Sequence, residues 1–144
     1  MPELSKSPPI AKPIPSITPD MVTFFEGAKR GQLMVQKCAA CGELRFPPHE
    51  ICTNCLGTQA GWVPVSGLGE VYSFNIMHQV YHPGFATEVP YAVVVVKLEE
   101  GVKFVSNLIG VKPDGIRVGM PVEVTFEKMS DDVWLPKFRP RARS

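Results

Sequence analysis

The four cysteines of this 144-residue chain fall into two C-x-x-C pairs, and the chain contains no fifth cysteine. Cys38 and Cys41 form the first pair, and Cys52 and Cys55 form the second. Two such pairs can place four thiolates around one tetrahedral metal ion, with each sulfur about 2.3 Å from zinc. Four sulfur ligands leave no open coordination position for water or a substrate. The spacing therefore predicts a structural site that holds one zinc ion.

The same cysteines are compatible with other chemistry. Iron in a rubredoxin-like site uses the same ligands, and the sequence does not distinguish it from zinc. Two disulfides would require an oxidising compartment, but the N-terminal residues lack the continuous apolar core of a secretion signal. A thioredoxin-like redox pair needs one C-x-x-C near a βαβ pattern, which is missing. We therefore expect a cytoplasmic protein whose thiolates bind metal and do not act as nucleophiles.

Composition narrows the class of protein. Hydrophobic residues make up 44% of the chain and charged residues 20%, which is typical of a globular fold. The net charge of +1 gives no broad positive field for binding nucleic acid. No apolar run approaches the length of a membrane span. We expect partners other than nucleic acid or membrane.

The N-terminal part contains an arm and one helix. Residues 1–17 are rich in proline and lack apolar periodicity, so we expect an extended arm. Residues 18–31 have the pattern of a helix that Pro19 begins and a glycine ends. Its adjacent Phe24 and Phe25 need a surface to cover, and this surface is either the protein's own core or another subunit.

The remaining sequence divides into two modules. Residues 32–66 contain both cysteine pairs and too little apolar sequence for a substantial core, so metal binding should drive their folding. Residues 67–144 contain five β-rich runs separated by Gly, Pro and Asp, followed by a basic tail. Five antiparallel strands in about 75 residues predict a Greek-key barrel of the OB-fold type. The predicted fold is mainly β: an N-terminal helix, a rubredoxin-like zinc ribbon and a five-stranded OB-fold barrel.

The segment between the first two barrel strands is a candidate recognition loop. Residues 77–91 are too long for a tight hairpin and contain Tyr81, His82, Phe85 and Tyr91. OB-folds usually recognise ligands through long loops of this kind, and aromatic side chains can stack on an adenine or contact a protein. Alternatively, the loop folds back on its own barrel and its aromatics form a satellite core. No arrangement of residues in the chain indicates a catalytic site.

Three stretches together carry a family resemblance. They are FFEGAKRGQLMVQKCAACGELRFPPHEICTNC (24–55), PYAVVVVKLEEGVKFVSNLIG (90–110) and VGMPVEVTFEK (118–128). In these stretches, and over roughly residues 20–140, the chain resembles the acyl-CoA-associated zinc-ribbon/OB-fold proteins, long catalogued as a domain of unknown function. The four cysteines match the metal ligands of that family. Its members typically assemble with thiolase-superfamily proteins: thiolases, steroid side-chain aldolases and hydroxymethylglutaryl-CoA synthase.

This resemblance implies a non-catalytic, zinc-binding accessory subunit in a hetero-oligomer with an acyl-CoA-processing enzyme. Such a subunit stabilises its partner and contributes to binding the CoA thioester. The candidate contacts with the partner or CoA are Phe24, Phe25, Tyr81, His82, Phe85 and Tyr91. Two other functions compete with this one. A single-stranded nucleic-acid binder would need basic residues interleaved with aromatics on the strands, and a rubredoxin-like electron carrier would need iron in place of zinc.

Overall fold

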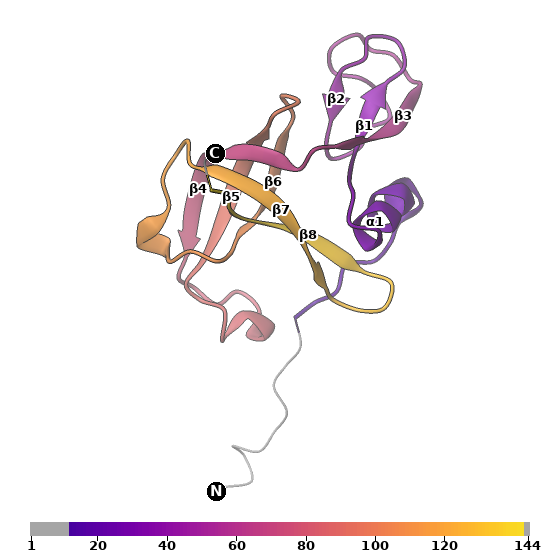
Figure 1. Cartoon of the computed structure of the whole chain (residues 1–144). Helices are drawn as coiled ribbons and strands as arrows, with labels where there is room; N and C mark the ends of the chain where they lie inside the picture. Colours follow the sequence, from indigo (N-terminus) through magenta and orange to yellow (C-terminus); the bar gives the residue numbers. More distant parts are fainter. Residues whose placement is uncertain (1–11, 143–144) are drawn as a thin grey trace, which may run out of the picture.

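The computed structural model describes residues 12–142, which form a short helix, a three-stranded ribbon and a closed barrel (Figure 1). Most of the predicted arm, residues 1–17, and the last two residues of the basic tail lie outside the described residues. In the described part of the chain, no helix is long and apolar enough to cross a membrane.

The helix begins with a 3₁₀ turn, Pro19–Met21, and continues as α1, Val22–Lys29. It ends at a glycine, as its sequence pattern predicts. Gly31 has a φ of +79°, and its N–H donates to the carbonyl oxygen of Ala28 at 3.0 Å. The next N–H, that of Gln32, donates to the carbonyl oxygen of Gly27 at 2.8 Å. These two bonds form a Schellman motif, which turns the chain directly into the first strand.

The two phenylalanines of α1 cover the protein's own core. Phe24 is 4% exposed and Phe25 is 5% exposed. The ring of Phe24 lies 4.7 Å from that of Phe46 and 6.1 Å from that of Phe104, measured between centroids. The prediction that Phe24 and Phe25 face a partner or CoA is therefore wrong. Helix, ribbon and barrel each contribute a ring to one aromatic cluster, which removes these side chains from the surface.

The ribbon is a small antiparallel sheet with the strand order β2-β1-β3. Its strands are β1 (Leu33–Cys38), β2 (Leu44–Arg45) and β3 (Ala60–Val65). The first three residues of β1 are buried, and Figure 1 shows α1 beside the ribbon and near β8 of the barrel. The ribbon is therefore joined to the rest of the core through the start of β1, while both cysteine pairs lie toward its far end.

The barrel closes in the strand order β4-β5-β6-β8-β7, with β4 paired to β7. Its strands are β4 (Leu68–Met77), β5 (Tyr91–Leu98), β6 (Lys103–Leu108), β7 (Pro121–Lys128) and β8 (Trp134–Pro140). Along β5 the buried residues alternate with more exposed ones, because Ala92, Val94, Val96 and Leu98 point into the barrel. This architecture confirms the predicted fold class of helix, ribbon and five-stranded barrel.

Strands β4 and β5 approach each other closely at Gly69. A Cβ atom at this position would lie 2.5 Å from the carbonyl oxygen of Lys97 and 2.8 Å from Cγ1 of Val96. Backbone cannot move aside as an exposed side chain can, so any side chain here must separate the two strands. Gly61 in β3 provides a contrast, because a Cβ there would meet nothing within 4 Å.

We predict that Gly69→Ala lowers the free energy of unfolding by about 1–3 kcal/mol, the usual cost of overpacking. Gly61→Ala is the matched control and should leave the free energy unchanged or raise it slightly, because alanine suits a strand better than glycine. Urea unfolding of both variants measures the difference. Equal midpoints for the two variants would show that the close approach at Gly69 is not a constraint.

Candidate metal centre

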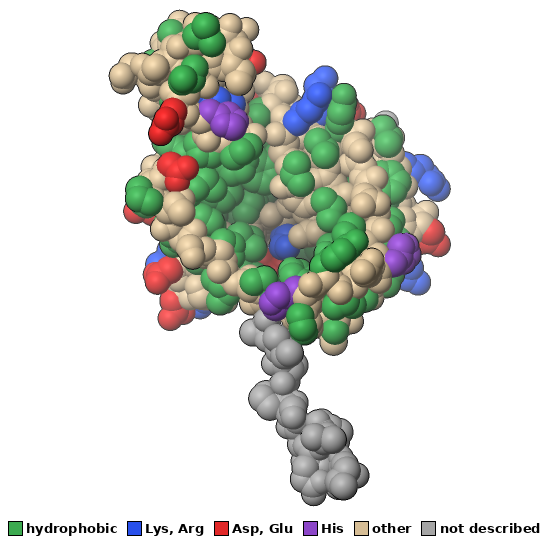
Figure 2. Space-filling model, turned by 180° about the vertical axis from the view of Figure 1, so that it is seen from behind, with side chains coloured by type: hydrophobic (Ala, Val, Ile, Leu, Met, Phe, Trp, Pro, Cys, Tyr) green, Lys and Arg blue, Asp and Glu red, His purple; other side chains and the backbone are tan. Residues whose placement is uncertain are grey.

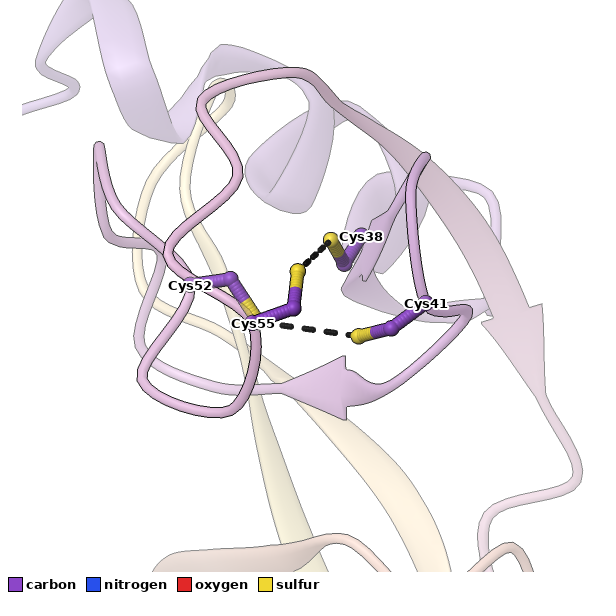
Figure 3. Close-up of side chains that lie close together, drawn as sticks. All are labelled: Cys38, Cys41, Cys52 and Cys55. Atoms are coloured by element: carbon purple, nitrogen blue, oxygen red, sulfur yellow. Dashed lines mark hydrogen bonds between the residues drawn. The ribbon is translucent and has the colours of Figure 1, made fainter.

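The structure brings the four cysteine side chains together at one end of the ribbon (Figure 3). All four sulfur atoms lie within 4.8 Å of one another. The Sγ atoms of Cys38 and Cys55 are 3.5 Å apart, and those of Cys41 and Cys52 are 3.7 Å apart. A regular tetrahedron with sulfur–zinc bonds of about 2.3 Å has sulfur–sulfur edges of about 3.8 Å. The spacing fits one zinc ion with four protein ligands.

Both cysteine pairs lie in turns of the same design. The N–H of Gly42 donates to the carbonyl oxygen of Cys38 at 2.9 Å, and the N–H of Leu56 donates to that of Cys52 at 2.9 Å. In each turn, the residue after the second cysteine is therefore hydrogen-bonded to the first cysteine. This main-chain closure aims both sulfurs of each pair toward the other pair. The backbone of the two turns thus sets the positions of the four sulfur ligands.

Main-chain N–H groups also point at the sulfurs. Asn54 donates its N–H to Sγ of Cys52, and Gly57 donates to Sγ of Cys55, each at 3.4 Å. Donors of this kind favour the thiolate form, which is the form that binds metal. A side chain at Gly57 would be crowded, because a Cβ there would lie 3.2 Å from Sγ of Cys55 and 3.3 Å from Cβ of Ala40.

The pKa values of the thiols differ because the four groups are crowded. Main-chain N–H groups of Cys41 and Ala40 lower the pKa of Cys38 to about 6. At Cys55 the N–H of Gly57 lowers the pKa, but the nearby Cys38 sulfur and burial outweigh it and raise the pKa to about 12. Four adjacent negative charges are not stable without a cation. A divalent metal ion relieves this repulsion, so the donor set suits Zn²⁺.

A hydrogen-bonded brace holds the second cysteine pair against the ribbon. Arg45 donates from Nε to Oε1 of Gln36 at 2.5 Å and from Nη2 to the carbonyl oxygen of His49 at 2.9 Å. The N–H of His49 donates to the same Oε1 at 2.9 Å. The brace fastens the segment before Cys52 to β1 and β2. His49 takes part through its main chain, and nothing in the sequence pattern signals this brace.

The loop between β4 and β5 places its predicted contact residues in different environments. Tyr81 is 72% exposed. Phe85 and Tyr91 are half-buried, and their ring centroids are 5.6 Å apart. Nδ1 of His82 accepts the N–H of Gly84 at 2.9 Å, so this ring takes part in a local turn. Phe85 and Tyr91 form the satellite cluster that the sequence left as an alternative, and Tyr81 is the exposed aromatic of the loop.

The described end of the arm ties this loop to the barrel. Nζ of Lys12 lies 2.7 Å from Glu88 in the loop and 3.3 Å from Glu127 in β7. The hydrogen bond to Glu88 raises the pKa of Lys12 above its usual value, although burial opposes the shift. The ammonium also lies 5.8 Å from the ring centroid of Phe85. The sequence does not indicate these contacts, because they join residues 76 and 115 positions apart and no local pattern reflects them.

A small cavity of about 60 Å³ lies beside these residues. Lys137 lines it and donates from Nζ to Oδ1 of Asn107 at 2.7 Å. Burial lowers the pKa of Lys137, and the negative charge of Glu127 opposes this shift. Pockets that hold small-molecule ligands have volumes of about 300–1,000 Å³. This cavity has room for a few water molecules, so its residues support the loop rather than enclose a ligand.

Two family models match adjoining parts of the chain. The "ChsH2, rubredoxin-like zinc ribbon domain" matches residues 25–60, and the "ChsH2, C-terminal OB-fold domain" matches residues 62–127. Together they cover both cysteine pairs and most of the barrel.

Several similar proteins are named as components of enzymes. The chain is 40% identical to a "Probable enoyl-CoA hydratase alpha subunit" of Thermomonospora curvata, over 96% of this chain but only 43% of that protein. It is 34% identical to the "Benzoylsuccinyl-CoA thiolase subunit BbsA" of Geobacter metallireducens, over 78% of this chain and 75% of the relative. A solved structure, "Ltp2-ChsH2(DUF35) aldolase", contains a chain that is 42% identical, with a TM-score of 0.78. That match covers 88% of this chain and 98% of the other.

We predict that Cys55→Ser lowers the zinc content below one ion per chain and lowers Tm by roughly 5 °C or more, because metal binding energy is folding energy in the ribbon. Thr53→Ser, an exposed change between the same two cysteines, is the control and should keep both values. Metal analysis and thermal unfolding test this. A metal-free Cys55→Ser protein with unchanged Tm would contradict the structural role.

Proposed function

The chain belongs to the ChsH2 family of zinc-ribbon and OB-fold proteins, and we propose that it is a non-catalytic accessory subunit of a thiolase-type acyl-CoA enzyme complex. In this proposal the partner chain carries out the reaction. The accessory chain stabilises the partner and contributes to binding the CoA thioester. We also propose that the complex is cytoplasmic, in line with the reduced thiols that the metal site requires.

The observation that carries the proposal is the likeness to the solved aldolase chain. That likeness extends over 98% of the other chain at 42% identity, so it includes both ribbon and barrel. The name of the solved structure joins a ChsH2 (DUF35) component with Ltp2 in an aldolase. A second relative is named as a subunit of a thiolase. An aldolase and a CoA thiolase thus each have a component of this kind by name, which supports a partner role for the fold.

The metal centre supports a non-catalytic role. Its four sulfurs lie close enough together to supply all four ligands of one tetrahedral zinc ion, which would leave no position where a substrate oxygen or water could bind the metal. The chain has no further cysteine to act as an acyl-accepting nucleophile. The hydratase relative does not argue for hydratase activity here, because this chain spans 43% of that protein.

The surface available to a partner differs from the one that the sequence indicated. With Phe24 and Phe25 buried, the helix no longer supplies exposed aromatics. The loop between β4 and β5 still does, since Tyr81 is 72% exposed and Val80 is 42% exposed. Large exposed aromatics are frequent anchors in protein interfaces. We therefore propose that the tip of this loop contacts the partner enzyme.

We predict that the purified chain alone has no thiolase, aldolase, hydratase or CoA-thioester hydrolase activity, because it offers neither a free thiol nor an open metal position. Spectrophotometric assays with acyl-CoA substrates, repeated after addition of the partner enzyme, measure this. Turnover by the isolated chain that a point substitution in it abolishes would contradict the proposal.

We predict that Tyr81→Ala weakens assembly with the partner enzyme by more than about 1 kcal/mol if Tyr81 is a central anchor. The partner is obtained by co-purification with the tagged wild-type chain. Tyr72→Ala is the control, because Tyr72 is also an exposed tyrosine, 49% exposed, but lies on the barrel wall beneath Lys103. Weakening by Tyr72→Ala and not by Tyr81→Ala would place the interface on the outer face of β4 to β6.

A further inference from the structure

The two cysteine turns differ in one residue at equivalent positions. Gly42 follows Cys41 with a φ of +78°, and Leu56 follows Cys55 with a φ of +65°. Each of the two residues donates its N–H to the carbonyl oxygen of the first cysteine of its pair at 2.9 Å. Both turns therefore require the left-handed backbone conformation. One turn meets that requirement with a glycine, and the other places a leucine there.

This conformation is unfavourable for leucine. In the left-handed region the Cβ atom of an L-residue lies too close to its following carbonyl oxygen. Glycine avoids this clash, and asparagine and aspartate tolerate the conformation better than other residues. Leu56 is the one non-glycine residue with positive φ in the described part of the chain. A glycine at position 56 would satisfy the same turn without strain. The backbone conformation of the turn therefore does not explain why a leucine, and not a glycine, occupies position 56.

Packing within the chain does not explain Leu56 either. Its side chain is 74% exposed, the highest value among the large apolar side chains of residues 12–142. Ile51, just before the same cysteine pair, is 53% exposed. Neither residue belongs to the core cluster. The second cysteine turn thus presents apolar side chains to solvent from a backbone that the hydrogen bond between Leu56 and Cys52 closes.

Resting on the function proposed above, we propose that Leu56 is an anchor that the zinc ribbon inserts into an apolar pocket of the partner enzyme. A side chain on a backbone that is already fixed by a hydrogen bond loses no further backbone freedom on binding, which lowers the cost of association. Backbone strain retained at one exposed position is consistent with a role outside the stability of the free chain. The zinc ion would then serve binding as well as folding, because it holds this side chain in position.

We assign the pocket to an enzyme and not to a second copy of the chain, because the solved structure that this chain resembles is named as an aldolase with a ChsH2 component. A stable interface buries about 800 Å² on each partner, which two side chains on a protruding turn cannot supply alone. Leu56 must therefore be one contact within a larger interface. Figure 2 shows that the molecule is hollowed between ribbon and barrel on one face, and that hydrophobic side chains line the hollow. A partner that enters this hollow would lie directly beside the ribbon.

The Leu56→Gly variant distinguishes an effect on binding to the partner enzyme from an effect on the stability of the free chain. We expect this variant to keep one zinc ion and to unfold at the same or a higher temperature, because glycine relieves the strain. Its affinity for the enzyme co-purified with the tagged wild-type chain should fall at least tenfold. Leu56→Asn is a second variant, since asparagine tolerates the left-handed conformation but is polar, and should lose affinity similarly. Val118→Ser, which removes a barrel side chain that is 67% exposed, should bind as the wild type does.

Two results would overturn the inference while leaving the proposed function intact. The first is unchanged affinity of Leu56→Gly for an enzyme that binds the wild-type chain. The second is a lower unfolding temperature of the free Leu56→Gly chain, which would show that the leucine serves its own fold. A wild-type chain that assembles with no acyl-CoA enzyme would remove both the proposed function and this inference.

Discussion

The fold of the ribbon depends on four cysteine sulfurs lying close enough together to bind one metal ion. Thiolates at separations of 3.5 to 3.7 Å repel one another, and a divalent cation bound between them would replace that repulsion with four metal–sulfur bonds that link the two cysteine pairs. The ribbon has few buried residues of its own beyond the start of β1. Without this cross-link, the segments carrying the two cysteine pairs would have little to keep them together.

The metal-held ribbon in turn completes the core of the whole molecule. Phe46 follows β2 and lies between Phe24 of the helix and Phe104 of the barrel, with ring centroids 4.7 Å from each. The connection from ribbon to barrel is also fixed, because Glu100 accepts the N–H of Ser66 at 2.7 Å. This bond ties the segment between β3 and β4 to the β5–β6 hairpin. The position of the metal centre is thus coupled to the barrel through packing and through a hydrogen bond.

Local patterns in the sequence predicted those parts of the structure that are determined by interactions between residues close together in the chain. Cysteine spacing predicted the metal centre, and Gly31 predicted the end of the helix. The β-rich runs separated by Gly, Pro and Asp predicted the five barrel strands. The surroundings of Phe24 and Phe25 could not be predicted in this way, because a helix face looks the same whether it meets its own core or another chain. The same holds for the contacts of Lys12 and Arg45. They join residues brought together only by the fold, and a charged residue in sequence does not reveal its distant partner.

The central claim is that a zinc-braced chain acts as a component of an acyl-CoA enzyme rather than as an enzyme by itself. Native mass spectrometry of the tagged chain purified from its own cells tests this claim most directly, because one spectrum reports partner, stoichiometry and metal. We predict a hetero-oligomer that contains a thiolase-superfamily enzyme and one zinc ion for each copy of this chain. A metal-free chain, or a zinc-bound chain that carries no enzyme, would contradict it.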